Sequence, residues 1–237
     1  MNPQLDRRSM LGLTGAATLV PVLAACGGGK HKHEKPVASA TPVSPPPSAG
    51  ALPDMVMIIR HAEKPNGSGT PYGITEAGER DEESLTVRGW TRAGALVELF
   101  DPRAAGGSAV PTRQGISRPA TIFASSPGGH GSKRPQQTVS ALAAALDLQV
   151  DLRFAKGQEA DLAAALPGIR GPVLISWQHE NIGVIIAHLG GIEPTPPKSW
   201  PDERFDVVYV FARNGNGWTF TQIPQLLLSG DLPTPIR

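Results

Sequence analysis

Two residues that can carry out phosphate chemistry stand together at the end of an apolar run. Residues 55–59 are all apolar, and Arg60 and His61 follow them directly. Such a run predicts a buried strand of a parallel sheet, and ligands bind at the carboxyl ends of such strands. A guanidinium group can bind phosphate oxygens through two N–H groups, and a neutral imidazole can attack phosphorus. An isolated Arg-His pair, however, is more often simply solvated.

Two later segments repeat this pattern and strengthen the interpretation. Residues 121–127 are typical of a short strand and turn, and Arg134 follows after a glycine-rich stretch. Residues 173–178 are typical of a third apolar strand, which ends at His179. Because the carboxyl ends of parallel strands share one edge of a sheet, two arginines and two histidines can surround a hole of the size of a phosphate group.

Four motifs in this order resemble the histidine phosphatase superfamily, the group that includes phosphoglycerate mutases and histidine acid phosphatases. The first is the strand that ends in Arg60-His61. The second is an L-T-x-x-G-x-x-R-A helix start at residues 85–93. The third is an S-S-P element followed by R-x-x-Q-T at residues 125–138, and the fourth is the strand before the second histidine at residues 173–179. Together the motifs span roughly residues 55 to 190.

The sequence departs from the family pattern in two places. Ala62 stands where the family usually has glycine after the first histidine. Five residues, 128–132, separate the Ser-Pro pair from Lys133-Arg134, where the family often has one or two. Pro135 favours the first position of a helix. We therefore expect Arg134 just before a helix over 135–146, where its side chain and the helix N-terminus both face an anion.

The resemblance implies a two-step phosphoryl transfer. His61 attacks phosphorus and becomes a phosphohistidine, while Arg60, Arg134 and His179 bind the phosphate oxygens. This is electrostatic positioning, which requires no metal and no other cofactor. Lys64 is a candidate for a further substrate contact, although a solvated lysine after a strand fits equally well.

The proton donor for the leaving group is the least secure assignment. In the acid-phosphatase branch the acid directly follows the second histidine, and Glu180 has that place here. In the mutase-like branch the acid is a glutamate from an insertion, for which Glu159 is a weak candidate. Alternatively, Glu180 only stabilises the start of a helix through its dipole. Asn181, the next residue, is a candidate for substrate binding or for orienting its neighbours.

The first 53 residues predict export and a lipid anchor. Arg7-Arg8 precede a short apolar stretch over 11–25, which is typical of a twin-arginine signal peptide over residues 1–25. Cys26, the only cysteine, follows Leu-Ala-Ala as in a bacterial lipobox. Residues 26–53 are rich in glycine, proline and serine and are expected to form a tether. The chain is then expected on the outer side of the cytoplasmic membrane, or in the periplasm or outer membrane.

Residues 54–237 suit one domain, for which we expect a three-layer α/β/α sandwich around a mainly parallel sheet. The expected helices cover 87–100 with Thr86 as N-cap, 135–146, 158–166 and 181–189. The expected strands cover 55–59, 121–125, 149–154 and 173–177, with a hairpin of 206–213 and 218–223 at the sheet edge. The balance of 22 basic against 21 acidic residues, with no basic stripe, gives nucleic-acid binding no support.

Three functions fit these observations. The first is a phosphomonoesterase that acts on a small phosphorylated substrate or a phosphoprotein. The second is a phosphoryl-transferring mutase, which the predicted export argues against. The third is a binding lipoprotein with a degenerate site, which would not need the nucleophile. Residues 66–84 and 102–119 are expected to set specificity. The acidic run at 79–83 is expected to be a solvated face. His130 is expected at most to line the entrance of the site, and His188 to be exposed or to cap the end of a helix.

Overall fold

The computed structural model describes residues 52–237 except 68, 129 and 130. The predicted signal peptide, Cys26, nearly all of the predicted tether and His130 lie outside the described residues. Within the described part, no helix is long and apolar enough to cross a bilayer.

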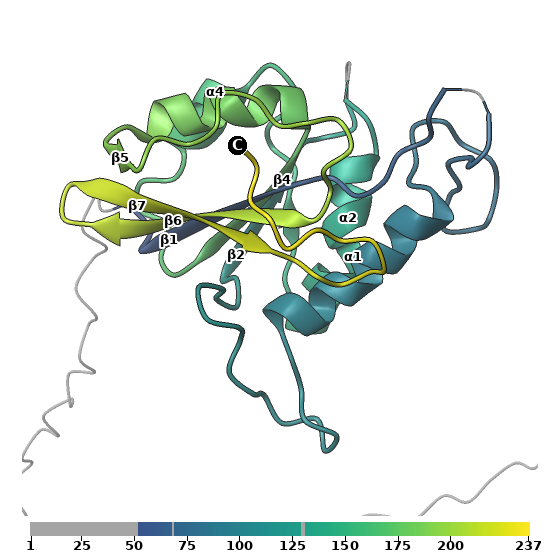
Figure 1. Cartoon of the computed structure of the whole chain (residues 1–237), viewed down its shortest axis with the longest axis horizontal. Helices are drawn as coiled ribbons and strands as arrows, with labels where there is room; N and C mark the ends of the chain where they lie inside the picture. Colours follow the sequence, from purple (N-terminus) through teal and green to yellow (C-terminus); the bar gives the residue numbers. More distant parts are fainter. Residues whose placement is uncertain (1–51, 68, 129–130) are drawn as a thin grey trace, which may run out of the picture. The chain divides into compact units, whose positions relative to one another are not determined.

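The domain is built on one mixed sheet in the order β3-β2-β4-β1-β6-β7-β5. The strands are β1 (Met55–Arg60), β2 (Thr121–Ala124), β3 (Val150–Asp151), β4 (Val173–Trp177), β5 (Ile192–Glu193), β6 (Val207–Asn214) and β7 (Gly217–Pro224). Only β6 runs against the other strands, because it pairs antiparallel with both β1 and β7. The sheet is therefore mainly parallel, as predicted, and β1 and β4 lie side by side near its centre (Figure 1).

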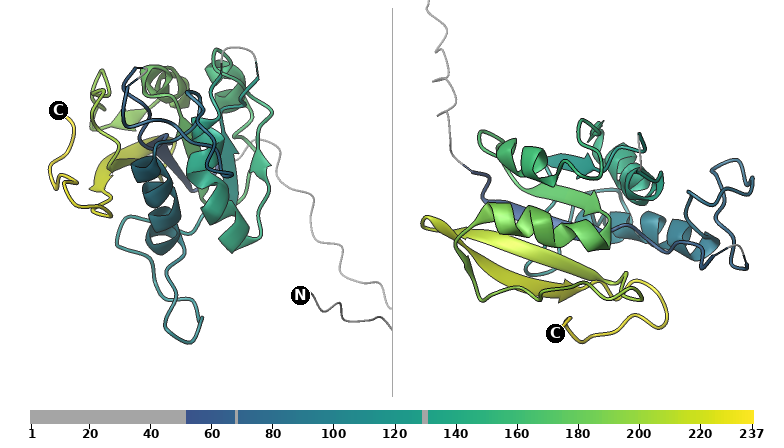
Figure 2. Two further views of the ribbon diagram at one scale, coloured as in Figure 1. Left: turned by 90° about the vertical axis from the view of Figure 1, so that its right-hand side faces the viewer. Right: turned by 90° about the horizontal axis from the view of Figure 1, so that it is seen from above.

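Two pairs of helices cover the two faces of this sheet. Helices α1 (Val87–Phe100) and α2 (Arg134–Leu146) pack on one face, and α3 (Glu159–Ala164) and α4 (His179–Leu189) on the other (Figure 2). The predicted three-layer α/β/α sandwich is confirmed. Helix α1 has the predicted bounds, since the hydroxyl of Thr86 accepts a hydrogen bond from the backbone of Gly89 and so caps the helix.

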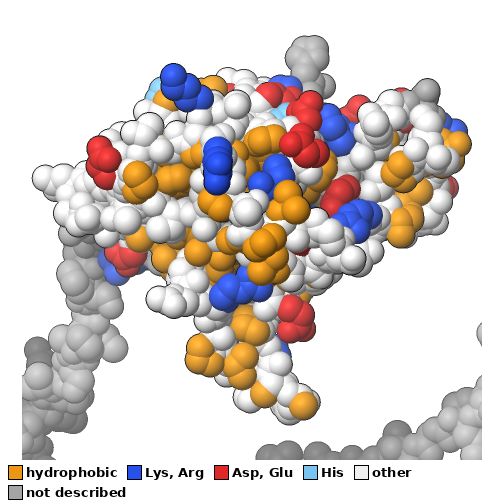
Figure 3. All heavy atoms as spheres, in the orientation of Figure 1, with side chains coloured by type: hydrophobic (Ala, Val, Ile, Leu, Met, Phe, Trp, Pro, Cys, Tyr) orange, Lys and Arg blue, Asp and Glu red, His pale blue; other side chains and the backbone are white. Residues whose placement is uncertain are grey.

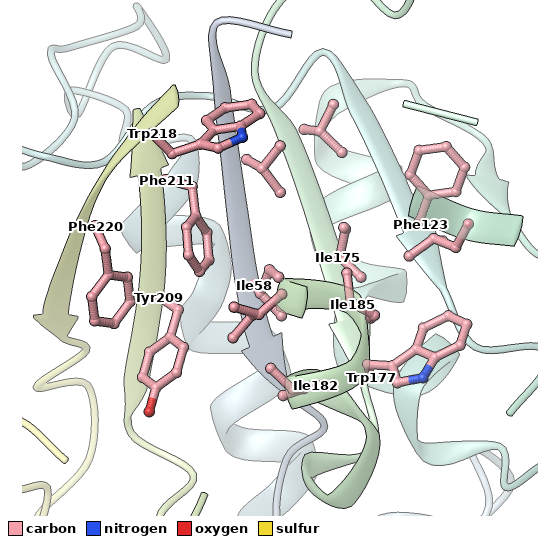
Figure 4. Close-up of a cluster of buried hydrophobic side chains, with 14 of the residues drawn as sticks. Ile58, Phe123, Ile175, Trp177, Ile182, Ile185, Tyr209, Phe211, Trp218 and Phe220 are labelled. Carbon is pink, nitrogen blue, oxygen red and sulfur yellow. The ribbon is translucent and has the colours of Figure 1, made fainter. Parts of the chain in front are cut away.

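The alternation of side chains along β1 explains why its apolar run is continuous. Val56 and Ile58 face the α4 side, while Met57 and Ile59 face the α1 and α2 side. All four are fully buried. Figure 4 shows the cluster on the α4 side, where Ile58 lies among side chains of β4, β6 and α4. Burial of each of these side chains contributes roughly 1.5–3 kcal/mol to the stability of the fold. Packing on both faces of the sheet therefore fixes the strand that carries Arg60.

The structure differs from the predicted elements mainly at helix starts and at one sheet edge. Helix α2 begins at Arg134 itself, and α4 begins at His179, two residues before the prediction. Gln178 is extended, with φ −75° and ψ 132°, so β4 runs into α4 without a loop. The predicted hairpin is present as β6 and β7. It is not the sheet edge, however, because the two-residue strand β5 pairs beyond β7.

Candidate active site

The four residues predicted to surround a phosphate come together at the carboxyl end of β1. Arg60 is the last residue of that strand and His61 follows it, while Arg134 is the first residue of α2 and His179 the first of α4. The charges of Arg60, Arg134 and His179 all act on the ring of His61. In Figure 3, acidic and basic side chains gather at the surface near the start of α4.

His61 is held as a neutral imidazole with one nitrogen free. Its ring is buried, with 3% of the residue exposed. Nδ1 lies 2.8 Å from the carbonyl oxygen of Ala62. Because a carbonyl can only accept, Nδ1 carries the proton and donates it. Burial, and after it the charges of Arg60, Arg134 and His179, lower the pKa of His61 to about 3 against the opposing effect of the Ala62 hydrogen bond. At neutral pH, Nε2 therefore keeps its lone pair.

The guanidinium of Arg60 is held on one side and has no partner on the other. Nη1 donates to the carbonyl oxygens of Pro201 at 3.0 Å and Asp202 at 2.5 Å. The group lies 4.0 Å from the centre of the Phe205 ring. Nε and Nη2 are buried and have no hydrogen-bond partner among the described residues. Burial lowers the pKa of Arg60 to about 10, so the group stays charged at neutral pH. It therefore offers two N–H groups to an anion.

The guanidinium of Arg134, like that of Arg60, has partners for some of its nitrogens and none for another. Nη1 donates to the carbonyl oxygen of Glu82 at 2.8 Å, and Nη2 lies 3.6 Å from a carboxylate oxygen of Glu83. Nε is buried without a partner in the described chain. Lys133 pairs with Asp81 at 2.8 Å. Glu79, Glu82 and Glu83 are exposed, in agreement with the predicted solvated face. Three residues of the run nevertheless contact the start of α2, at Lys133 and Arg134.

His179 lies between two carboxylates. Its Nε2 contacts a carboxylate oxygen of Asp202. Its Nδ1 lies 2.8 Å from Oε2 of Glu180, at an angle that makes no hydrogen bond. Burial and the charge of Arg60 lower the pKa of His179, and these effects outweigh the raising effects of Glu180 and Asp202. Asp202 thus touches His179 with its side chain and Arg60 with its backbone.

Glu180, the predicted proton donor, is ionised in this environment. Lys156 donates to Oε1 of Glu180 at 2.7 Å. Partial burial raises the pKa of Glu180, but the Lys156 hydrogen bond, the backbone N–H of Glu180 and the charge of His179 outweigh it and lower the pKa to about 2. A general acid must hold a proton at the working pH. The geometry therefore does not favour Glu180 in that role, and the role stays a prediction.

The remaining candidates lie at the margin of this cluster or away from it. Lys64 is exposed and makes no hydrogen bond or ion pair among the residues described. Asn181 is half-buried in the first turn of α4, where its backbone N–H donates to Gln178. Glu159 is buried and accepts from the indole N–H of Trp177 at 2.9 Å, which is a structural contact. His188 is exposed in the last turn of α4.

Two close contacts set the distances from the nucleophile segment to α2 and to α1. The hydroxyl of Thr138 accepts from the backbone N–H of Ala62 at 2.8 Å and donates to the carbonyl oxygen of Arg134 at 2.8 Å. At Gly89, an added Cβ would lie 2.5 Å from the carbonyl oxygen of Glu63, so only glycine lets α1 approach the nucleophile segment this closely.

Sequence reasoning missed the segment that closes the site over Arg60. Residues 201–205, between β5 and β6, supply Asp202 and Phe205, and no motif marks them. Of the two segments expected to set specificity, 66–84 reaches Arg134 through Glu82. The other, 102–119, hydrogen-bonds to the end of β7 instead, where Arg113 donates to the carbonyl oxygens of Pro224 and Gln225.

The donors of this cluster suit an anion. They are guanidinium and imidazole groups, which bind phosphate oxygens. No group of three or more histidine, cysteine, aspartate and glutamate side chains in the described part of the chain is arranged to hold a metal ion.

No protein-family model matches this sequence, and no curated protein matches it. Solved structures are similar to it in fold. One is described as a phosphohistidine phosphatase, SixA, of Agrobacterium tumefaciens, with 19% identity over 71% of this chain and 96% of that chain, and a TM-score of 0.41. Another is mycobacterial hydrolase 2, with 14% identity over 71% and 88%, and a TM-score of 0.38. A third, from Escherichia coli K-12, is described as an alpha-ribazole-5′-phosphate phosphatase, with 14% identity over 70% and 94%, and a TM-score of 0.39.

Proposed function

We propose that this protein is a phosphoric monoester hydrolase of the histidine phosphatase superfamily, with His61 as its nucleophile. One observation carries the proposal. A buried, neutral imidazole with its Nδ1 proton fixed by Ala62 adjoins the unpartnered N–H groups of Arg60 and Arg134. The descriptions of the similar structures agree with this function, but at such low identities they do not carry it.

The chemistry follows from these groups. Nε and Nη2 of Arg60 and Nε of Arg134 bind non-bridging oxygens of the phosphate. Nε2 of His61 attacks phosphorus, the bond from phosphorus to the ester oxygen breaks, and the ester oxygen takes a proton from solvent water and leaves as the alcohol. A water molecule then attacks the phosphorus of the phosphohistidine, the bond from phosphorus to nitrogen breaks, and the water gives up a proton to solvent. Inorganic phosphate leaves and the ring is neutral again. The arginines stabilise the charge that builds on the phosphate oxygens in both steps, which is the main source of catalysis in such reactions.

Hydrolysis of p-nitrophenyl phosphate tests this proposal. His61→Ala should abolish turnover and remove the acid-labile phosphoenzyme that rapid quenching traps in the wild type. His188→Ala, which changes an exposed histidine at the far end of α4, should leave both unchanged. Undiminished turnover in His61→Ala would refute the phosphohistidine mechanism.

We also propose that the enzyme is exported and anchored by lipid on Cys26. The sequence around Arg7-Arg8 and Cys26 supports this, and the tether over 26–53 would hold the domain away from the membrane. A single acyl chain binds membranes only marginally, so stable anchoring needs the several chains of a lipoprotein cysteine. Intact-mass spectrometry on the native host should find a mature chain that begins at acylated Cys26. The Cys26→Ser variant should carry no lipid, and an unprocessed N-terminus in the wild type would reject the anchor.

A further inference from the structure

A cavity of about 250 Å³ adjoins the candidate active site. It lies between α4 and residues 197–200, and His179 forms part of its wall. The apolar part of the lining comes mainly from Ile182, Ile186, Trp200 and the ring of Tyr209. The polar residues Glu180, Lys198 and Ser199 also line the cavity, and Lys198 and Ser199 are exposed. A concave apolar site with a few polar groups is the usual form of a small-molecule site. Because His179 belongs both to this cavity and to the phosphate cluster, the two share a wall.

Among the polar residues of the lining, Tyr209 is the most deeply buried. Only 2% of this residue is exposed, and its hydroxyl is buried with no hydrogen-bond partner among the described residues. Figure 4 shows the hydroxyl pointing out of the hydrophobic cluster, toward the end of the sheet where β1 ends. Burial raises the pKa of Tyr209, so the phenol stays protonated at neutral pH. A buried hydroxyl that lacks a partner is costly, and an acceptor in the cavity would remove that cost.

The aromatic wall of the cavity is held in place before any ligand arrives. The indole N–H of Trp200 donates to the carbonyl oxygen of Arg204 at 2.7 Å. The rings of Trp200 and Tyr209 pack with centroids 4.4 Å apart. Both rings therefore present a fixed surface, which reduces the ordering that binding would otherwise require.

We propose that this cavity binds the alcohol part of the substrate, and that this part is a single aromatic or heteroaromatic ring that carries a hydrogen-bond acceptor for Tyr209. The inference rests on the proposed hydrolysis at His61. A cavity of about 150 Å³ holds a benzene ring, so one of about 250 Å³ takes one ring with a substituent. The substrate class is thus a small ring-bearing phosphomonoester.

Calorimetry with non-hydrolysable phosphonates tests the cavity without turnover. Burying a ring should make benzylphosphonate bind about tenfold or more tightly than methylphosphonate. A 4-acetyl group on the ring should tighten binding by a further factor of about 3–10 through the Tyr209 hydroxyl. Tyr209→Phe keeps the ring of the wall and should abolish only this second gain. Tyr72→Phe, at an exposed tyrosine, is the matched control and should keep both gains.

The outcomes separate this inference from the proposed function. Equal affinities for methylphosphonate and benzylphosphonate would overturn the ring site while leaving phosphate binding intact. An acetyl gain that survives in Tyr209→Phe would overturn the role of the hydroxyl. Turnover that persists in His61→Ala would instead refute the proposed mechanism, and the phosphonate affinities would still decide the cavity. In kinetics, benzyl phosphate should exceed ethyl phosphate in kcat/KM by a similar factor of about ten.

Discussion

Burial acts on the two neighbours at the end of β1 with opposite consequences for their charge. It lowers the pKa of His61 to about 3 and that of Arg60 to about 10. At neutral pH the first residue is uncharged and the second keeps its charge. The same desolvation therefore produces a nucleophile with a free lone pair beside a cation that can bind the phosphate it attacks. A lysine at position 60 would offer a point charge without the two-pronged donor set.

The buried ring of His61 predicts a pH-dependent stability. The unfolded ring has a pKa near 6.5 and the folded ring one of about 3, so the unfolded state binds more protons between these values. The free energy of unfolding should therefore rise with pH through this window, by up to about 1.4 kcal/mol per pH unit, and this contribution should be constant above it. Urea unfolding between pH 5 and 7 should show a shallower slope for His61→Gln than for the wild type.

Other groups also titrate in acid. The contribution of His61 is therefore the difference between the wild type and His61→Gln in the slope of the free energy of unfolding against pH. His188→Gln replaces an exposed histidine and should keep the wild-type slope. If His61→Gln keeps that slope as well, the ring of His61 is not held neutral by burial.

The ionised state of Glu180 gives a second prediction at this scale. Its pKa of about 2 leaves it without a proton for the leaving group. We therefore expect Glu180→Gln to lower kcat/KM by less than about tenfold, and by the same factor for an alkyl phosphate and for p-nitrophenyl phosphate. A general acid would instead cost roughly 10²–10⁴-fold with the alkyl phosphate only, because nitrophenolate leaves without a proton. The ratio of the two losses decides between these roles.

At the scale of elements, the hydroxyl of Thr138 joins α2 to the end of β1. Thr138→Val keeps the shape of the side chain but leaves the buried N–H of Ala62 without its acceptor. We expect a loss of about 1–3 kcal/mol in the free energy of unfolding. A lower kcat should accompany it, because the position of Arg134 relative to His61 is then less firmly fixed. Urea unfolding and the kinetics of p-nitrophenyl phosphate measure the two effects.

Ser140 provides the matched control on the same helix. Its hydroxyl donates to the carbonyl oxygen of Gln137 at 3.0 Å, within the helix and away from the nucleophile. Ser140→Ala should leave kcat unchanged. Equal kinetic losses in both variants would show that the Thr138 contact does not position the site.

Local signals explain which elements could be predicted from the sequence. Helix α1 has the expected bounds because its Thr86 cap and its apolar periodicity both lie within the segment. Strand β5 could not be predicted, since two residues show no alternation and its pairing with β7 depends on the rest of the sheet. The positions of Asp202 and Phe205 were missed for a similar reason. Their loop is placed by the carbonyl contacts of Arg60, which lies more than a hundred residues earlier.

At the scale of the domain, Arg92 joins three distant segments. It is buried in α1, and its Nη2 donates to Glu63 at 2.8 Å and to Asp231 at 2.7 Å. Its Nη1 donates to the side chain of Gln225 at 3.0 Å. Glu63 lies two residues after His61, and Asp231 lies in the segment that follows β7. One guanidinium thus ties the C-terminal segment to the nucleophile segment.

Removing this guanidinium should destabilise the whole domain. Burial alone would lower the pKa of Arg92, but the hydrogen bonds of Asp231 and Glu63 outweigh it and raise the pKa, so the guanidinium stays charged. Arg92→Met fills similar space but leaves two largely buried carboxylates, those of Glu63 and Asp231, with only the half-exposed Arg88 as a cationic partner. Breaking a buried pair in this way costs about 3–5 kcal/mol. Urea unfolding at pH 7 should show a loss of that size.

An exposed ion pair gives the comparison that makes this prediction specific. Arg153 pairs with Asp151 at 2.7 Å, but its side chain is 66% exposed. Arg153→Met should lower the free energy of unfolding far less than Arg92→Met does, because solvent screens the pair. If Arg92→Met costs no more than Arg153→Met, the network does not hold the C-terminal segment to the nucleophile segment. If it costs several times more and also lowers kcat/KM for p-nitrophenyl phosphate, the packing of the C-terminal segment contributes to the geometry around His61.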